Sequence, residues 1–214
     1  MAASTGSRAR VLITGFGPFP GVPTNVSCSL VRRLVFKARA VLPDLRFVAA
    51  VLPTEWMRAP QRVTQLHKLH EPVLALHFGV ASRMRGFRIE TEARNFRRML
   101  PDAAGALPPS SRVCEEDIER RAAALDAPSI AAHLGRKGYC ASLSNNAGDY
   151  LCNAVLYQSL IEAERRGSRC KVGFIHVPAD LLPQDMLNIA IPGACEIVKI
   201  ALMRSRPVSA LTSA

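Results

Sequence analysis

A cysteine in the second half of the chain stands where its thiol could act as a nucleophile. The segment "SNNAGDYLCNAVLYQSL" (residues 144–160) predicts the end of a short strand, a polar turn and an amphipathic helix with Asp149 as its N-cap. Cys152 then falls in the first helical turn, where free backbone N–H groups and the positive end of the helix dipole favour a thiolate. The alternative interpretation is a cysteine that only packs in the core.

A thiolate nucleophile needs a partner that exchanges a proton near neutral pH, and histidine is suited to this. His176 ends the apolar run "KVGFIHV" and precedes Pro178, which stops a regular strand. We therefore expect His176 on the same rim of a sheet as the Cys152 turn. His77 also ends a strand-like run, and we interpret it as a core histidine whose ring N–H is satisfied by backbone. The histidines in predicted exposed helical stretches are His67, His70 and His133.

An acidic side chain would be needed to orient the imidazole. Glu90 and Glu92, in "FRIETEARN", are same-face neighbours in a strand-like segment, and the pattern alone does not choose between them. Either carboxylate could instead pair with a flanking arginine.

The run "RVLITGFGPFPG" (residues 10–21) is an apolar strand that ends in a loop of glycines and prolines. Gly-x-Gly after a strand invites a dinucleotide-binding interpretation. Pro18 and Pro20, however, lack the N–H groups that would face a phosphate, and Phe16 and Phe19 occupy positions that are usually small and polar. The loop therefore indicates two rings presented to a flat apolar group, with two core phenylalanines as the alternative.

These residues must be positioned by alternating strands and helices. Strand-like runs lie at residues 10–15, 45–53, 72–79, 87–93, 140–145 and 171–177, and helical periodicity lies at residues 25–40, 54–70, 127–136, 149–166 and 195–204. This order predicts an α/β fold with a mostly parallel sheet covered on both faces. Ligands in such folds bind beyond the carboxyl ends of the strands. Residues 102–126 are read as an irregular loop or flap.

Composition bounds the class of protein. With 214 residues, 49% of them hydrophobic, one domain is the default. The N-terminus has no apolar region typical of a signal peptide, and the longest apolar stretches are judged too short to span a bilayer, so we expect a cytoplasmic protein without membrane association. The six cysteines show no CxxC spacing, which favours free thiols and no metal site.

The net charge of +11 raises the possibility of a nucleic-acid partner. The basic residues are dispersed in short clusters, and aromatic residues make up only 6% of the chain. We therefore predict a solvated basic surface and no nucleic-acid partner.

Four segments, in order, resemble the signature regions of pyroglutamyl peptidase I, the pyrrolidone-carboxylate family of cysteine peptidases. They are "TGFGPF", "IETEARN", "SNNAGDYLCN" and "GFIHVP", and the resemblance runs from about Val11 to the C-terminal helix. It implies a single-domain α/β/α sandwich over residues 10–206, with a flexible N-terminus at 1–9 and a tail at 207–214. It also implies removal of an N-terminal 5-oxoproline from peptides, without a cofactor or metal, by an enzyme that assembles as a homo-oligomer, a tetramer or dimer.

The resemblance also assigns roles to residues. It implies a catalytic triad of Cys152, His176 and Glu90, thereby selecting Glu90 over Glu92. It implies that Phe16 and Phe19 sandwich the pyroglutamyl ring and that Asn25 fixes their loop.

The sequence departs from the family in places. The family's Gly-Arg pair before the triad glutamate is displaced, which leaves Arg83 or Arg85 as a possible oxyanion contributor, and Thr91 replaces a common arginine. Preference for the residue after pyroglutamate is therefore expected to differ. A phosphate-binding enzyme, a nucleic-acid-binding module and an inactive homologue are the alternatives.

Overall fold

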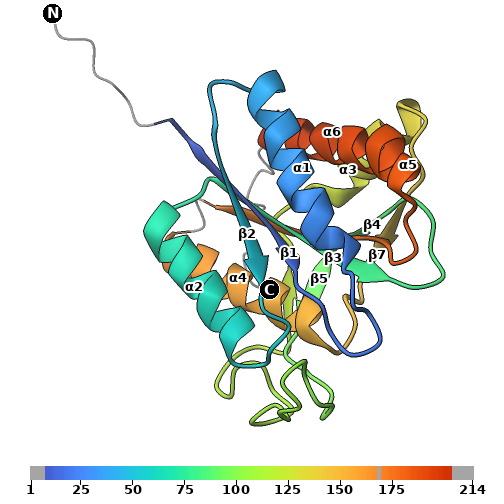
Figure 1. The fold of residues 1–214 in the computed structure, drawn as a ribbon. Coiled ribbons are helices and arrows are strands. Elements are labelled where there is room, and N and C mark those ends of the chain that lie inside the picture. The colour runs from blue at the N-terminus through green and yellow to red at the C-terminus, as the bar shows by residue number, and fades with distance from the viewer. Residues whose placement is uncertain (1–7, 168–169, 204–214) are drawn as a thin grey trace, which may run out of the picture.

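The computed structural model describes residues 8–167 and 170–203, and its centre is a six-stranded sheet in the order β2-β1-β3-β8-β4-β7 (Figure 1). Strands β1 (Arg10–Phe16), β2 (Arg46–Leu52), β3 (Leu74–Ala81) and β8 (Lys171–Pro178) are parallel. Strand β4 (Phe87–Glu90) runs antiparallel to β8, and β7 (Ala141–Ser144) pairs with β4 in parallel. The predicted mostly parallel sheet is thus confirmed.

Helices cover both faces of the sheet, as the predicted three-layer sandwich requires (Figure 1). Helices α1 (Val26–Val41), α3 (Ala127–Arg136) and α6 (Ile191–Met203) pack together on one face, and α2 (Arg58–His70) packs with α4 (Leu151–Arg165) on the other. Each face has its own apolar core, because near-continuously apolar strands present buried side chains in both directions. The β8 side chains illustrate this, with Phe174 in one core and Ile175 in the other.

The N-cap of helix α4 lies one residue later than predicted. This N-cap is Tyr150, whose side chain makes no capping hydrogen bond. The prediction of Asp149 as N-cap is wrong, because the Asp149 carboxylate pairs with Arg98 at 2.7 Å. Cys152 is nevertheless the second residue of the helix, so its predicted place in the first turn is confirmed.

The C-terminal helix is much longer than predicted. Segments α5 (Pro183–Asp185), η1 (Met186–Ala190) and α6 form one helical run, and the π-helical turn η1 precedes Pro192, which cannot donate a backbone hydrogen bond. This 21-residue run is long and apolar enough to cross a membrane by length and composition, contrary to the prediction that apolar stretches are too short. The buried face of α6 packs against α1 and α3. A core helix packs in this way, and a core helix can also meet the criteria of length and composition.

The predicted strand at 87–93 is divided at Thr91, whose N–H donates to the Ser144 carbonyl. Strand β4 ends at Glu90, and β5 (Glu92–Arg94) pairs with β6 (Arg120–Ala122) in a separate two-stranded sheet. The predicted irregular segment 102–126 therefore contains one short strand.

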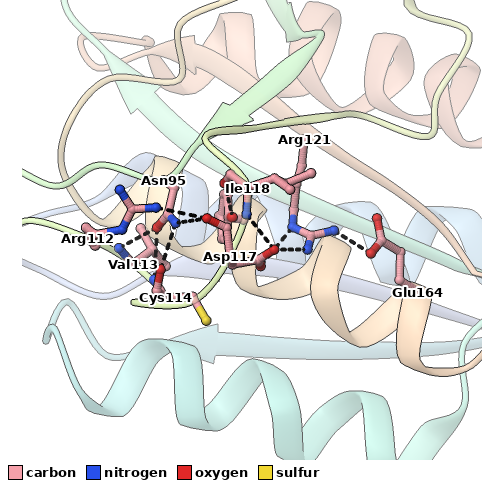
Figure 2. Close-up of polar contacts among 9 residues, drawn as sticks. Asn95, Arg112, Val113, Cys114, Asp117, Ile118, Arg121 and Glu164 are labelled. Atoms are coloured by element: carbon pink, nitrogen blue, oxygen red, sulfur yellow. Dashed lines mark hydrogen bonds and ion pairs between the residues drawn. The ribbon is translucent and has the colours of Figure 1, made fainter.

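The irregular segment is held down by two buried polar side chains (Figure 2). Asn95 accepts from the backbone N–H groups of Val113 and Cys114 and donates to the Cys114 carbonyl. Arg121 pairs with Asp117 at 2.5 Å and with Glu164 of α4. These contacts tie the segment to β5 and α4, the elements next to Cys152.

Parts of the sequence predictions lie outside the described residues. These are most of the predicted flexible N-terminus (residues 1–9), the tail at 207–214 and the last residue of the helix predicted at 195–204.

Candidate active site

A row of residues crosses the carboxyl ends of the central strands. The register pairs His176 of β8 with Gly79 of β3 on one side and with Arg88 of β4 on the other. Thr14 of β1 pairs with His77 of β3, so Phe16, two residues further along, reaches the level of Gly79. Because residues opposite one another in register point to the same face, this row faces α2 and α4.

His176 connects the two other predicted catalytic residues. Its Nδ1 lies 2.8 Å from Oε1 of Glu90, which is fully buried, and Cys152 lies near enough to its ring to raise the pKa of the imidazole. The second Glu90 oxygen, Oε2, has no hydrogen-bond partner among the described residues, so His176 is the group that offsets burial of this carboxylate. Glu92 instead pairs with Arg120 at 2.5 Å.

The electrostatic environment favours a charged imidazole. Burial alone would lower the pKa of His176, but the charge of Cys152, together with hydrogen bonds to Cys152 and Glu90, raises this pKa to about 9. A histidine in this setting holds a proton at neutral pH and can give it to a leaving group.

Gly79, which the sequence analysis did not single out, makes room for the thiol. A Cβ atom at this position would lie 2.9 Å from Cys152 Sγ and 2.7 Å from the Phe174 ring, both too close for a real side chain. The strand can therefore approach α4 only with glycine here. In the sequence, the feature that could have pointed to this close approach is a glycine directly after the apolar run "LALHF".

The turn before Cys152 is tied to β5. The side chain of Asn153, fully buried, donates to the carbonyls of Arg94 and Phe96 and accepts from the Arg94 N–H. The Arg94 guanidinium in turn donates to Asn146, whose side-chain oxygen also accepts from the Gly148 N–H. Asn153 was also missed, since an amide one residue after the cysteine shows its partners only in three dimensions.

A pocket of about 270 Å³ lies over the row and is lined by Cys152, His176, Phe16 and Phe19. Phe16 is buried, whereas Phe19 is half-buried in a turn closed by backbone hydrogen bonds with Val22. The two loop phenylalanines therefore share a pocket with the cysteine and the histidine.

Asn25 joins this loop to the helix that follows it. Its Oδ1 accepts from the Ser27 N–H as the N-cap of α1, and its Nδ2 donates to the Gly17 carbonyl at 3.0 Å. The N-terminus of α1 is thus capped by the chain itself and lies eight residues beyond Gly17, unlike the Gly-rich loop that leads directly into a helix at a phosphate site.

The arginine that lines the pocket is Arg88, not either of the two predicted ones. Arg83 and Arg85 are exposed in the turn before β4, and neither is among the described residues that line the pocket. The alternation of β4 accounts for this, because Arg88 and Glu90 are two residues apart and share a face.

The remaining histidines have structural environments. His77 is buried as predicted, but its ring nitrogens meet the hydroxyl groups of Thr14 (2.7 Å) and Ser159 (2.8 Å), not backbone. His67 was predicted to be exposed and is fully buried, with Nε2 2.8 Å from the same Ser159 hydroxyl. His70 and His133 are half-buried, and His133 pairs with Glu196.

All six cysteines are free thiols. Within residues 8–167 and 170–203, no group of three or more His, Cys, Asp or Glu side chains is arranged to hold a metal ion.

An α/β/α sandwich that places a cysteine at a helix N-terminus beside a histidine at one pocket, with a buried carboxylate bonded to that histidine, has the arrangement of a cysteine-type hydrolase. The sequence profile described as pyroglutamyl peptidase matches residues 9–204. The chain therefore belongs to the pyroglutamyl peptidase family.

Individual relatives agree with this assignment. The chain is 31% identical to the pyrrolidone-carboxylate peptidase of Yersinia pestis (strain Pestoides F) over 186 residues, covering 86% of this chain and 83% of that protein. The crystal structure of Bacillus amyloliquefaciens pyroglutamyl peptidase I superposes with a TM-score of 0.78 at 26% identity, over 92% of this chain and 96% of that one. The pyrrolidone carboxyl peptidase from Thermococcus litoralis also gives a TM-score of 0.78, at 27% identity over 91% and 94% of the two chains.

Proposed function

We propose that this chain hydrolyses the peptide bond after an N-terminal pyroglutamyl residue, with Cys152 as nucleophile, His176 as general acid and base, and Glu90 as the residue that orients His176. The observation that carries the proposal is the His176 ring, which contacts Glu90 at 2.8 Å and the Cys152 side chain beside the pocket of Phe16 and Phe19. Membership of the pyroglutamyl peptidase family supports it independently.

In the first half of the reaction, the Cys152 thiolate attacks the carbonyl carbon that joins pyroglutamate to the next residue. A C–S bond forms and the carbonyl oxygen takes the electron pair as an oxyanion. The N-cap side chain of Tyr150 accepts no hydrogen bond from the first turn of α4, so the backbone N–H groups of this turn are available to hold the charge. The C–N bond then breaks as His176 gives its proton to the leaving amine, which leaves a thioester.

In the second half, neutral His176 takes a proton from a water molecule that attacks the thioester. The C–S bond breaks, free pyroglutamate departs, and the thiolate–imidazolium pair is restored. Glu90 stabilises the imidazolium in both halves through its bond to Nδ1.

The pocket chemistry suits an uncharged ring. A pyroglutamyl lactam is flat and carries no ammonium group, so aromatic faces such as those of Phe16 and Phe19 bind it without burying a charge. An ordinary charged amino terminus would lose its hydration there.

The test is hydrolysis of pyroglutamyl-β-naphthylamide by the reduced protein, by Cys152→Ser and by an iodoacetamide-treated sample. Release of naphthylamine by the untreated protein alone is the expected result. Equal release by Cys152→Ser would contradict the assignment of the nucleophile, and no release by the wild type would contradict the proposed activity.

We further propose that the protein acts in the cytoplasm as a homo-oligomer, a tetramer or dimer, on the basis of the family resemblance. Light scattering on the purified protein tests the assembly, and cell fractionation tests the location.

A further inference from the structure

Arg88 is a cationic side chain of the active-site pocket that the proposed catalytic steps do not use. It is half-buried, lines the pocket, and forms no hydrogen bond or ion pair with any residue in the described part of the chain. It shares a face with Glu90, whose Oε1 is engaged by His176 and whose Oε2 forms no hydrogen bond with Arg88 or with any other described residue. A partly desolvated guanidinium without an anionic partner is a site for a carboxylate.

The order of residues along the sheet tells which part of a substrate Arg88 would meet. Phe16, Gly79, His176 and Arg88 come from β1, β3, β8 and β4, which are neighbours in this order. The ring-binding phenylalanine lies at one end of the row and Arg88 at the other, with His176 between them. His176 protonates the leaving amine, so the peptide beyond the scissile bond passes on the Arg88 side.

The other carboxylate that lines the pocket is paired with a different arginine. Asp149 also lines the pocket, but its carboxylate pairs with Arg98 at 2.7 Å. The pyroglutamyl ring is uncharged, so any charge complementary to Arg88 must lie on the leaving peptide.

We propose that Arg88 determines specificity by binding a carboxylate on the residue that follows pyroglutamate, so that the preferred substrates are pyroglutamyl peptides with an acidic next residue or pyroglutamyl dipeptides with a free carboxyl terminus. This inference rests on the proposed function, because it names the substrate class of that same site. Both sources present the same group, a carboxylate shortly after the scissile bond, to the same guanidinium.

Two matched pairs of peptides test the proposal by release of free pyroglutamate. The first pair, pyroglutamyl-Glu-amide and pyroglutamyl-Gln-amide, differs only in the side-chain charge. The second, pyroglutamyl-Ala with a free carboxylate and its amide, differs only in the terminal charge. We expect kcat/KM of the wild type to favour the charged member of at least one pair by about tenfold, mainly through KM. A factor of this size corresponds to the free-energy advantage of a charge-assisted hydrogen bond over a neutral one. The favoured pair identifies the source of the carboxylate.

The ratio within a pair does not depend on the fraction of folded enzyme, so a poorly folded variant remains informative. In Arg88→Gln the ratio should approach one, and in Arg88→Glu it should fall below one. Arg85→Gln removes the same charge three residues away, outside the pocket, and should keep the wild-type ratio. The proposal would be overturned if the wild type gave a ratio of one for both pairs, or if Arg88→Gln kept the ratio of the wild type.

Failure of the proposed function has a different signature. If the wild type releases nothing from pyroglutamyl-β-naphthylamide or from any of the four peptides, both proposals fall. If it hydrolyses all of them without a charge preference, only the role of Arg88 falls.

Discussion

At the scale of single residues, the pKa of His176 results from opposing effects of burial and of its charged neighbours. The residue is buried, which acts against a charged imidazole, yet its neighbours Cys152 and Glu90 raise its pKa to about 9. The ring is therefore protonated across the neutral range, and the balance depends on both neighbours being charged. Removing Glu90 should therefore change the pH range of activity, not only its size.

The variant Glu90→Gln tests this dependence. It removes a hydrogen bond and a negative charge that raise the pKa of His176, so the alkaline limb of kcat/KM should move from near pH 9 towards the ordinary value of 6.5. We expect kcat at pH 7 to fall by about tenfold or more, because general acid catalysis is weakened. The measurement is a pH–rate profile with pyroglutamyl-β-naphthylamide. Glu92→Gln, which loses only the pair with Arg120, is the control, and an equal shift in both variants would contradict the assignment.

At the scale of elements, the site depends on how closely β3 approaches α4. Gly79 allows this approach, because any side chain there would meet Cys152 Sγ and the Phe174 ring. Asn153 in turn fixes α4 to the end of β5. The helix that carries the nucleophile thus contacts both a strand of the main sheet and a strand of the small sheet.

Gly79→Ala should displace the thiol while leaving most of the fold in place. We expect kcat to fall by about a hundredfold, since a displacement near 1 Å at a reacting group has an effect of that order. Gly135→Ala in α3 is the matched control, because a Cβ there meets no atom within 4 Å. Steady-state kinetics and thermal unfolding of both variants make the comparison. Full activity in Gly79→Ala would show that the approach of β3 does not limit the position of Cys152.

At the scale of the whole molecule, buried histidines link folding to pH. Burial lowers the pKa of His67 to about 4 and that of His77 to about 3, and the two rings share the Ser159 hydroxyl in the core. The unfolded chain protonates both near pH 6.5, whereas the folded chain does so only near these lower values. Between these lower values and pH 6.5, the chain therefore takes up protons when it unfolds. The free energy of unfolding falls as the pH falls through this range.

His176 acts in the opposite direction. Its folded-state pKa of about 9 lies above the unfolded value of 6.5, so its contribution is fully present below pH 6.5 and is lost as the pH rises through 9. The free energy of unfolding should therefore be greatest near pH 6.5. On the acid side, each of the two buried histidines should contribute a loss of about 1 kcal/mol per pH unit.

Urea unfolding followed by circular dichroism from pH 4.5 to 9 measures this profile. His67→Gln should roughly halve the histidine contribution to the acid slope. Identical acid slopes in the wild type and His67→Gln would contradict the role of His67.

Local sequence was enough to predict the alternation of strands and helices, the layered fold and the position of Cys152 in a first helical turn. These features depend on neighbouring residues, through hydrophobic periodicity and turn chemistry. Errors arose where tertiary contacts outweighed local preference. Asp149 is an ordinary N-cap residue, but here it pairs with Arg98, and the helix before Pro192 continues because a π-helical turn accommodates that proline.

Only the tertiary structure decided which distant side chains meet. The contact of Glu90 with His176 joins residues 86 positions apart, and the residues themselves did not distinguish Glu90 from Glu92, a choice that came from family resemblance. Gly79 beside Cys152, and Arg88 in place of Arg83 or Arg85, follow from the register of β3, β8 and β4. Register between strands is determined by packing of the whole sheet, and a shift of one residue would turn each of these side chains to the opposite face.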